Sequence, residues 1–321
     1  MKPKVLVTRE VFDEVLAYLQ EALEVESNQD DLALSSEELR RRLSDKDGVM
    51  CALTDRIDAG LVAACPRLKA VCNIAVGYNN IDVAACSARD IVVTNTPGVL
   101  DETTADLVWA LMLATARRLT EAEAYLRNGQ WTGWYLKQIL GTDVHHATLG
   151  IVGMGRIGQM IARRALGFEM EVIYHNRSPL GPAIEAPLKA RYVGMDELLA
   201  RADFVVLQVP YSSATRHLIG AAELARMKSS AILINAARGG VVDDAALIDA
   251  LGRGVIRAAG LDVFENEPKL DPGFLALKNV VLAPHIGSST RVTRLAMAMT
   301  AARNLVAAMT GEIPPNRVNP K

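Results

Sequence analysis

The sequence predicts an α/β protein built from two doubly wound parallel sheets, each forming its own domain. Two observations predict this class. Short apolar runs, typical of buried parallel strands, alternate with helical patterns along most of the chain. The break at Thr96-Pro97-Gly98 interrupts this alternation, and a chain of 321 residues with 50% apolar content can fill two hydrophobic cores.

The first domain is expected to comprise residues 1–98 and 288–321. Its apolar runs predict strands at residues 4–8, 24–26, 48–53, 68–72 and 91–93. The helical spacing of Val11, Val15, Leu16 and Leu19 predicts a helix after the first strand. The run from Ser35 to Leu39 begins another helix with a capping residue, and residues 290–310 form one long helix.

The second domain is expected to comprise residues 99–287. It should begin with a single long helix over residues 101–128, whose apolar residues are too many for one buried stripe and therefore predict packing on a second subunit. A helix is expected at residues 245–252. Apolar runs predict strands at residues 149–152, 172–174, 204–208, 231–235, 257–261 and 280–283.

Composition excludes several classes of partner. The net charge is −2 and no basic stripe is visible, so nucleic acid and anionic membranes are not expected partners. No apolar run reaches the roughly 18 to 20 residues needed to span a bilayer, and the N-terminus lacks a signal peptide's apolar segment, which predicts a cytoplasmic protein. Cys51, Cys65, Cys72 and Cys86 form no CxxC pair, so buried free thiols are expected rather than a metal site or disulfides.

The segment from residue 148 to 178 predicts a dinucleotide site. An apolar run leads into Gly153-Met154-Gly155-Arg156-Ile157-Gly158, and an amphipathic helix and a second apolar run follow. This order of strand, glycine turn, helix and strand is the context in which GxGxxG binds a dinucleotide in a Rossmann domain. Gly153 permits the turn, Gly155 lets backbone approach a diphosphate, and Gly158 lets the helix pack on the strand.

The end of the second strand favours NADPH. An NAD site usually carries Asp or Glu there, for the ribose 2′-OH, but this chain has Asn176, followed by Arg177 and Ser178. A cation and a hydroxyl suit a 2′-phosphate, and Arg156 in the glycine turn is placed to stack on the adenine or to assist the phosphate. The alternative interpretation is that Arg177 is a solvated surface arginine. NADH is therefore kept as the slower second choice.

Three motifs after later strands carry residues suited to reducing a ketone. Arg238 can bind a substrate carboxylate, His285 can donate the proton, and Glu267 can fix the ring of His285. Loops at the carboxyl ends of parallel strands meet at one edge of the sheet, so these side chains should converge beside the nicotinamide. Glu265 competes with Glu267 for this role, and Asp262 is either a base or a neighbour of the nicotinamide. The other histidines, at positions 145, 146, 175 and 217, are given no catalytic role.

The chain resembles the D-isomer-specific 2-hydroxyacid dehydrogenase family over essentially its whole length. The resemblance is carried by VGMGRIG, INAARGGVVDDAAL, AAGLDVFENEP and APHIGSST. It implies that Arg238 orients the keto acid, that Glu267 rather than Glu265 supports the histidine, and that His285 is the acid and base. It also implies a flavodoxin-like substrate domain beside the Rossmann cofactor domain, with substrate bound where the two domains close.

The resemblance implies further contacts. The N–H groups of Val76 and Gly77 would take the substrate carboxylate, and Trp134 would reach the active site of the neighbouring subunit in a homodimer. Positions that match cofactor contacts of the family, besides those already named, are Thr104, Ile157, Val209, Pro210, Thr215, Ala236, Asp262 and Gly287.

The function implied is the NADPH-dependent reduction of short 2-keto acids to D-2-hydroxy acids. Within the family, GTDVHHATLGIVGMGRIG is most similar to bacterial glyoxylate/hydroxypyruvate reductases that also reduce 2-ketogluconate. Two alternatives remain at this point: an NAD-dependent dehydrogenase of another D-hydroxy acid, and a non-enzymatic scaffold that senses dinucleotides.

Overall fold

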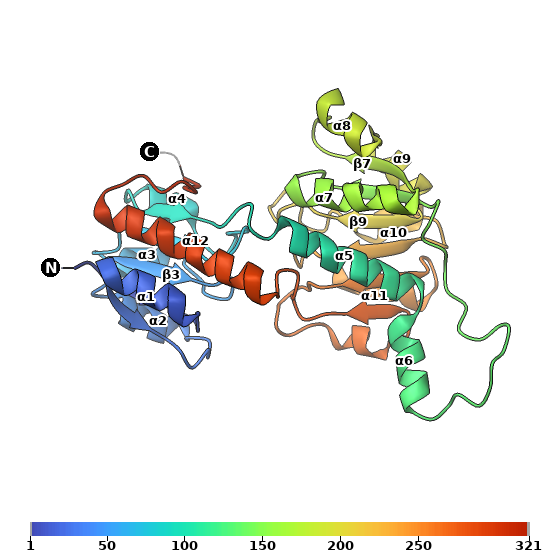
Figure 1. Ribbon diagram of the computed structural model, residues 1–321, viewed down its shortest axis with the longest axis horizontal. Helices are drawn as coiled ribbons and strands as arrows, with labels where there is room; N and C mark the ends of the chain where they lie inside the picture. Colours follow the sequence, from blue (N-terminus) through green and yellow to red (C-terminus); the bar gives the residue numbers. More distant parts are fainter. Residues whose placement is uncertain (1, 320–321) are drawn as a thin grey trace. The chain divides into compact units, whose positions relative to one another are not determined.

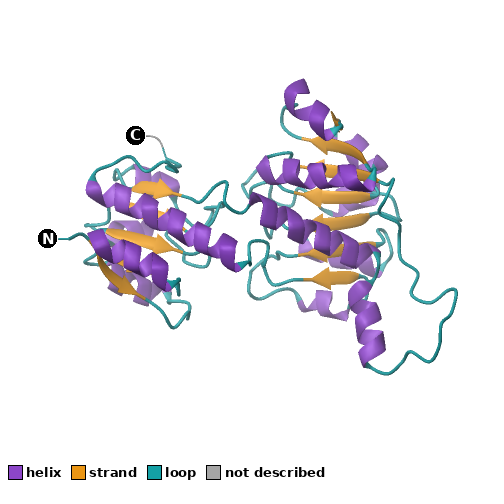
Figure 2. Cartoon of the chain, viewed as in Figure 1, coloured by secondary structure: helices purple, strands orange, loops and turns teal. Residues whose placement is uncertain are grey.

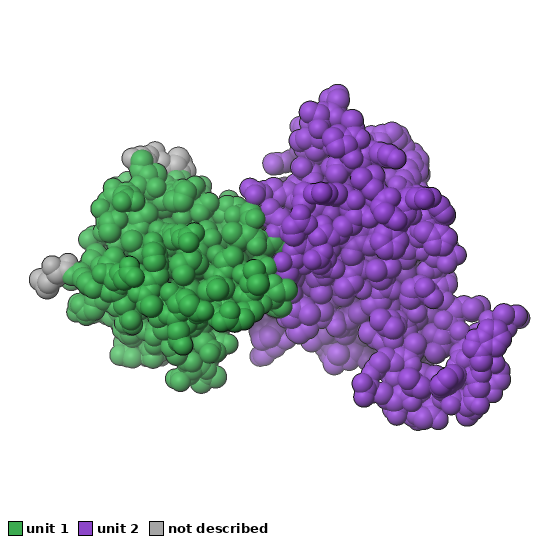
Figure 3. Space-filling model, in the orientation of Figure 1, with its two compact units in different colours: residues 1–100, 289–321 green, residues 101–288 purple. Residues whose placement is uncertain are grey.

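Two parallel sheets organise the chain, one in each of two units (Figures 1 and 3). The computed structural model describes residues 2–319. Unit 1 consists of residues 1–100 and 289–321, and unit 2 of residues 101–288. The chain passes from one unit to the other after Leu100 and again after Ser288.

Unit 1 has a five-stranded parallel sheet with the order β2-β1-β3-β4-β5. This is the doubly wound order of flavodoxin-like domains, which confirms the predicted class. Helices α1 and α12 lie side by side on one face of the sheet (Figure 1), and the residues of α2, α3 and α4 pack on the other face. The strands are β1 (Lys4–Val7), β2 (Glu24–Ser27), β3 (Gly48–Cys51), β4 (Ala70–Asn73) and β5 (Val92–Thr94). The helices are α1 (Asp13–Ala22), α2 (Ser36–Leu43), α3 (Ala59–Ala64), α4 (Val83–Ser87) and α12 (Arg291–Thr310).

Local contacts stabilise the ends and edges of the elements in unit 1. The side chain of Ser35 accepts a hydrogen bond from the Glu38 N–H and caps α2, as the sequence predicts. The Val318 N–H donates to the oxygen of Val93, so the C-terminal segment covers the free edge of β5. All four cysteines are free and buried, as predicted, and burial raises the pKa of Cys72 to about 12.

Unit 2 has a seven-stranded parallel sheet with the order β12-β11-β10-β9-β6-β7-β8. Counted from β6 within the unit, the strands follow the Rossmann order, so this part of the prediction is also confirmed. Residues of α5, α7 and α8 pack on one face, and residues of α9, α10 and α11 pack on the other. The strands are β6 (Thr148–Val152), β7 (Glu171–His175), β8 (Ala190–Tyr192), β9 (Phe204–Leu207), β10 (Ile232–Asn235), β11 (Ala258–Leu261) and β12 (Val280–Leu282). The helices are α5 (Asp101–Ala116), α6 (Leu119–Arg127), α7 (Arg156–Ala165), α8 (Pro182–Leu188), α9 (Met195–Arg201), α10 (Ala221–Arg226) and α11 (Asp244–Gly252), with 3₁₀ turns η1 (Leu166–Phe168) and η2 (Pro272–Ala276).

The prediction of one helix over residues 101–128 is wrong, because the chain breaks between α5 and α6 (Figure 2). Arg118 has a left-handed backbone with φ 52° and ends the α-helical path. The N–H of Thr142, where the chain returns to unit 2, donates a hydrogen bond to the backbone oxygen of Ala116 at the end of α5. The apolar residues of α5 pack within unit 2, whereas α6 has no buried residue. The excess apolar surface therefore belongs to α6 and the segment after it.

No helix within residues 2–319 is both long and apolar enough to cross a membrane.

Candidate active site

The glycine turn packs closely on its neighbours at two of its glycines and leaves open space at the third. Gly153 has φ +102°, and a Cβ there would lie 2.5 Å from the backbone oxygen of Gln208. A Cβ at Gly158 would lie 2.4 Å from the oxygen of Gly153, so α7 packs closely against β6. A Cβ at Gly155, by contrast, would meet nothing within 4 Å, which leaves open space at the start of α7. That space suits an anionic group at the helix N-terminus.

Asn176 follows β7 and is tied to the glycine turn. Its side-chain oxygen accepts a hydrogen bond from the Met154 N–H at 2.7 Å. Arg177 and Ser178 are exposed, and the guanidinium of Arg177 makes no hydrogen bond or ion pair with any described residue. Tyr192 donates to the oxygen of Asn176, so the loop that presents Arg177 is held at its start.

Arg156, the first residue of α7, is engaged by another helix. Its Nε donates to a carboxylate oxygen of Asp101 at 2.8 Å, which links α7 to the start of α5. The pair is exposed on the arginine side and nearly buried on the aspartate side. The structure therefore directs this guanidinium towards Asp101, a partner that the spacing of the motif does not predict.

Arg238 follows β10 and retains unused donors. Its Nη1 donates to the oxygen of Ala237 at 2.7 Å, while its Nε is buried without a partner in the described chain. Asn235 shapes the turn by accepting from the Ala237 N–H and donating to the Arg238 oxygen. Burial lowers the pKa of Arg238, and the charge of Glu267 acts in the opposite direction. A buried cation with a spare donor is suited to an anionic ligand.

Gly239 brings the Arg238 turn against the loop that carries Glu267. A Cβ at Gly239 would lie 1.7 Å from the oxygen of Phe264, closer than any real contact. Only glycine permits this approach of two backbones. The packing explains how the charge of Glu267 reaches Arg238, although the two residues are far apart in sequence.

Glu267 and His285 form a hydrogen-bonded pair. Oε2 of Glu267 lies 2.7 Å from Nδ1 of His285, and Oε1 accepts from the Phe264 N–H at 2.9 Å. Burial would raise the pKa of Glu267, but the hydrogen bond and charge of His285, the Phe264 N–H and the charge of Arg238 outweigh it and lower the pKa. Nε2 of His285 has no partner among the described residues. One ring nitrogen is thus fixed and the other is free to exchange a proton.

Asp262, at the end of β11, holds the loop of His285. Its carboxylate accepts from the N–H groups of Ile286 and Gly287, and its backbone oxygen accepts from the His285 N–H. Burial raises the pKa of Asp262, while these N–H groups and the charge of His285 oppose the increase. His285 has φ 53°, an unusual value for a residue with a side chain, and the Asp262 contacts stabilise it. Sequence reasoning missed this bracing role, although an acid directly after a strand was a usable signal.

Glu265 contacts a different histidine, His217. Its Oε1 lies 2.6 Å from Nε2 of His217, and its backbone N–H donates to Asp244. Asp243 lies 3.7 Å from the other ring nitrogen of His217. The competition between Glu265 and Glu267 is therefore resolved in geometry, because each carboxylate contacts a different imidazole. His145, His146 and His175 make no contact with the Arg238 turn or the Glu267 loop in the described chain.

The remaining predicted cofactor positions lie around the same sheet edge in unit 2. Thr215 donates to the oxygen of Pro210 at 2.7 Å and so closes the turn that starts with Val209. Thr104 is buried near Gly287, where an added Cβ would lie 3.5 Å from the Thr104 methyl group. Ala236 is buried after β10, and Ile157 is partly buried in the first turn of α7. Within residues 2–319, no group of three His, Cys, Asp or Glu side chains is arranged to hold a metal ion.

Val76 and Gly77 lie in unit 1, in the loop between β4 and α4. Both are partly buried, and neither N–H donates to another described residue. The loop is bonded to the ends of neighbouring strands through asparagine side chains.

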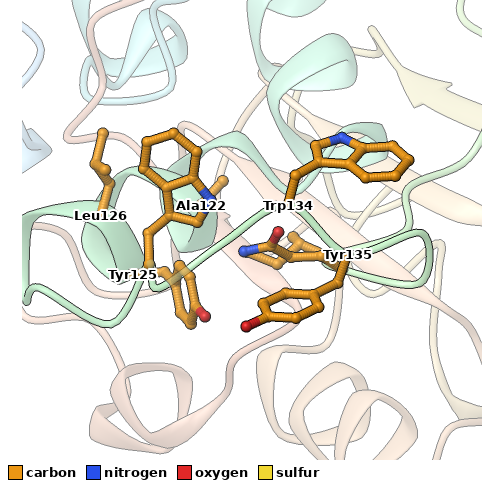
Figure 4. Close-up of a pocket in the computed structure, with 8 residues that line it drawn as sticks. Ala122, Tyr125, Leu126, Trp134 and Tyr135 are labelled. Carbon is orange, nitrogen blue, oxygen red and sulfur yellow. The ribbon is translucent and has the colours of Figure 1, made fainter.

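Trp134 lies on the segment after α6, and 78% of its surface is exposed. Together with α6 this segment, residues 119–140, forms an arm that stands away from the rest of unit 2 (Figures 1 and 3). Figure 4 shows Tyr125 and Leu126 of α6 on one side and Trp134 and Tyr135 on the other. They line a pocket of about 350 Å³ that Ala122, Trp131, Gln138 and Ile139 complete.

The fold and this site define a dinucleotide-dependent oxidoreductase, and comparison with known proteins agrees. Residues 109–287 match the family described as D-isomer specific 2-hydroxyacid dehydrogenase, NAD binding domain. A glyoxylate reductase from Thermococcus onnurineus is 49% identical over 99% of this chain and 96% of its own length. A crystal structure of a Thermus thermophilus protein has a TM-score of 0.91 and 45% identity, covering 98% of this chain and all of the other.

Another similar solved structure contains a dinucleotide. The NADPH-dependent glyoxylate/hydroxypyruvate reductase of Sinorhizobium meliloti, in complex with NADP and malonate, has a TM-score of 0.87. It is 34% identical over 99% of this chain and 97% of its own. The chain belongs to the D-isomer specific 2-hydroxyacid dehydrogenase family. It is an oxidoreductase with an NAD(P)-binding domain.

Proposed function

We propose that this protein reduces short 2-keto acids to D-2-hydroxy acids with NADPH, and that glyoxylate, hydroxypyruvate and 2-ketogluconate are its substrates. The observation that carries the proposal is the pair of Glu267 and His285, whose Nε2 is free, on loops packed against the turn of Arg238. Relatives that are 46% to 49% identical to this chain bear the name glyoxylate reductase, which favours glyoxylate as a substrate.

The residues of unit 2 fit a dinucleotide. Space for a diphosphate exists over Gly155, next to the N-terminus of α7. When bound, the reduced nicotinamide supplies the hydride. The residues that we propose to contact the cofactor are Thr104, Gly153, Gly155, Arg156, Ile157, Gly158, Asn176, Arg177, Ser178, Val209, Pro210, Thr215, Ala236, Asp262 and Gly287.

The chain's own residues would handle the substrate and the proton. Arg238 binds the carboxylate through its unused donors and polarises the neighbouring carbonyl, and the N–H groups of Val76 and Gly77 bind the carboxylate as well. His285, in its protonated form, donates the proton on Nε2 to the carbonyl oxygen as the alkoxide forms. Glu267 holds Nδ1 and stabilises the imidazolium before the transfer.

The test of this function is a substrate panel with both cofactors. We expect NADPH oxidation with glyoxylate, hydroxypyruvate and 2-ketogluconate, and slower oxidation of NADH. His285→Ala should abolish turnover and leave the binding of NADPH nearly unchanged. Cofactor binding without turnover of any 2-keto acid would favour a non-enzymatic dinucleotide sensor, and a preference for NADH would favour an NAD-dependent dehydrogenase.

Arg177 is the residue proposed to select NADPH. Its guanidinium is exposed and has no ion-pair partner in the described chain, so it is available to a 2′-phosphate. A charge-assisted hydrogen bond contributes about 1.5–3 kcal/mol, so Arg177→Ala should raise the KM for NADPH by about tenfold or more. The KM for NADH should stay near its original value.

Arg163→Ala is the matched control for this change. Arg163 is an exposed arginine on α7 without a hydrogen bond or ion pair among the described residues. The control removes the same charge from the same unit and should leave both KM values in place. An equal effect of Arg177→Ala on the two cofactors would refute the phosphate role.

We also propose that the arm of residues 119–140 binds a second copy of the chain. Leu126 and Trp131 are each 56% exposed and Leu136 is 77% exposed, an apolar surface that water does not favour. In the resulting homodimer, Trp134 would contribute to the partner's substrate site. Leu126→Asp should yield monomers in sedimentation experiments, and a dimer that persists in this variant would count against the arm as the interface.

A further inference from the structure

We propose that Asn95 is a positioning residue, which fixes the loop between β4 and α4 so that the N–H groups of Val76 and Gly77 are held ready for a substrate carboxylate. The inference rests on the proposed function, in which these two N–H groups bind the carboxylate. The new element is the set of side chains that orient these N–H groups, and all of these side chains lie within unit 1.

Three consecutive carbonyl groups of this loop have partners on the same unit. The oxygen of Ala75 accepts from the Thr96 N–H at 2.9 Å, and the oxygen of Val76 accepts from Nδ2 of Asn95 at 2.8 Å. The oxygen of Gly77 accepts from Nδ2 of Asn73, also at 2.8 Å. The partners come from the end of β4 and from the chain just after β5.

Fixing a carbonyl also fixes the next N–H. In a trans peptide unit the C=O of one residue and the N–H of the next point in opposite directions in one plane. The bond from Thr96 to Ala75 therefore turns the N–H of Val76 away from Thr96. The bond from Asn95 to Val76 likewise turns the N–H of Gly77 away from Asn95. The two neighbouring N–H groups, each turned away from its own unit's partner, are thus left available to an anion.

The asparagines are themselves held in place. Asn73 is fully buried, and its amide exchanges hydrogen bonds with that of Asn80. The amide of Asn80 also donates to the oxygens of Ala52 and Asp55, beyond the end of β3. The backbone oxygen of Asn95 accepts from Nδ2 of Asn304 on α12. The asparagines that hold the loop are thus themselves anchored near the ends of β3, β4 and β5 and to helix α12.

Asn95 is the informative residue to change. The one hydrogen bond that its side chain makes in the described chain is the bond to Val76, so its loss isolates this contact. Asn73, in contrast, also contacts Asn80 and the thiol of Cys51, so its removal would disturb several contacts at once. The test therefore uses Asn95→Ala. Asn79→Ala is the matched control, because Asn79 is exposed in the same loop and has no hydrogen bond among the described residues.

The readouts are chosen to separate positioning from folding. We expect Asn95→Ala to raise the KM for glyoxylate and the inhibition constant of oxamate together, by about tenfold, because an N–H group that is no longer held in one direction forms a weaker hydrogen bond to the charged carboxylate. The kcat should fall by less than about threefold, and the Kd for NADPH should not change. The control variant should match the wild-type enzyme in all four quantities.

A second variant covers the case in which alanine impairs folding. Asn95→Asp keeps the shape of the side chain, but its carboxylate cannot donate to the oxygen of Val76 and adds a negative charge near the carboxylate site. It should weaken oxamate binding at least as much as the alanine variant. Unchanged KM and inhibition constants in either folded variant would overturn the inference, as would an equal change in NADPH binding.

The outcomes also separate this inference from the function on which it rests. If the wild-type enzyme reduces 2-keto acids and binds oxamate while the Asn95 variants behave normally, only the positioning role is wrong. If the wild-type enzyme neither reduces a 2-keto acid nor binds oxamate, the proposed function is wrong, and the role given to Asn95 falls with it.

Discussion

Replacing Glu267 by glutamine should move the pH dependence of the reaction to lower pH. Oε2 of Glu267 lies 2.7 Å from Nδ1 of His285, and the two side chains are 32% and 29% exposed. Two unit charges about 4 Å apart attract by about 4 kcal/mol at an effective dielectric constant of about 20. Because this pair is partly solvated, its interaction is closer to the about 1.5–3 kcal/mol that a hydrogen bond to a charged group contributes. This corresponds to about one to two pH units.

The direction of the pH shift follows from the protonation form of His285 that the reduction and the reverse oxidation each require. Reduction requires the imidazolium, which the carboxylate stabilises, so the alkaline limb of kcat/KM should move down by about one to two units in Glu267→Gln. Oxidation of the D-2-hydroxy acid requires the neutral ring, so its acidic limb should move in the same direction. The Kd for NADPH should not change, because Glu267 is proposed to act on the ring of His285 and not on the cofactor.

Glu265→Gln is the matched control, since it removes the same charge from the same loop. Glu265 contacts His217 rather than His285, so both limbs should stay in place. The assay records initial rates of NADPH oxidation and of the reverse reaction across the pH range for both variants and the wild-type enzyme. A shift in Glu265→Gln as large as that in Glu267→Gln, or no shift in Glu267→Gln, would refute the assignment of the partner of His285.

Two further predictions concern stability. Burial raises the pKa of Asp244 from 3.8 to about 6, so the folded chain keeps this proton longer than the unfolded chain and stability falls as pH rises between these values. Asp244→Asn should therefore increase the free energy of unfolding at neutral pH by at most about 3 kcal/mol and raise the Tm by several degrees. Below about pH 4 the substitution should have no such effect. An unchanged Tm in thermal unfolding at neutral pH would contradict this prediction. Gly239→Ala would place a Cβ 1.7 Å from the oxygen of Phe264, so it should cost about 2–4 kcal/mol of stability and at least tenfold in kcat/KM. Gly252→Ala, where a Cβ would meet nothing within 4 Å, is its control, and equal Tm and activity in the two variants would show that the close approach is unimportant.

The sequence by itself determined the fold class and the glycine turn. Apolar runs and glycine spacing are local patterns, and a strand, a turn and a helix within some thirty residues leave few alternatives for the chain between residues 148 and 178. The motifs around Arg238, Glu267 and His285 were equally readable, because each follows an apolar run that predicts a strand, and parallel strands end at one edge of the sheet.

The tertiary structure decided which groups are partners. Glu265 and Glu267 are two residues apart in one loop, and their residue types and spacing left the choice between them open. The resemblance favoured Glu267, and the path of the backbone shows that Glu265 contacts His217 and Glu267 contacts His285. The break at Arg118 depends on a segment that returns from residue 142, so helical periodicity could not reveal it. Asn95 reaches the oxygen of Val76 across 19 residues of chain. Periodicity reports what each segment buries, whereas hydrogen-bond partners are set by distances between loops that meet only after the sheets have formed.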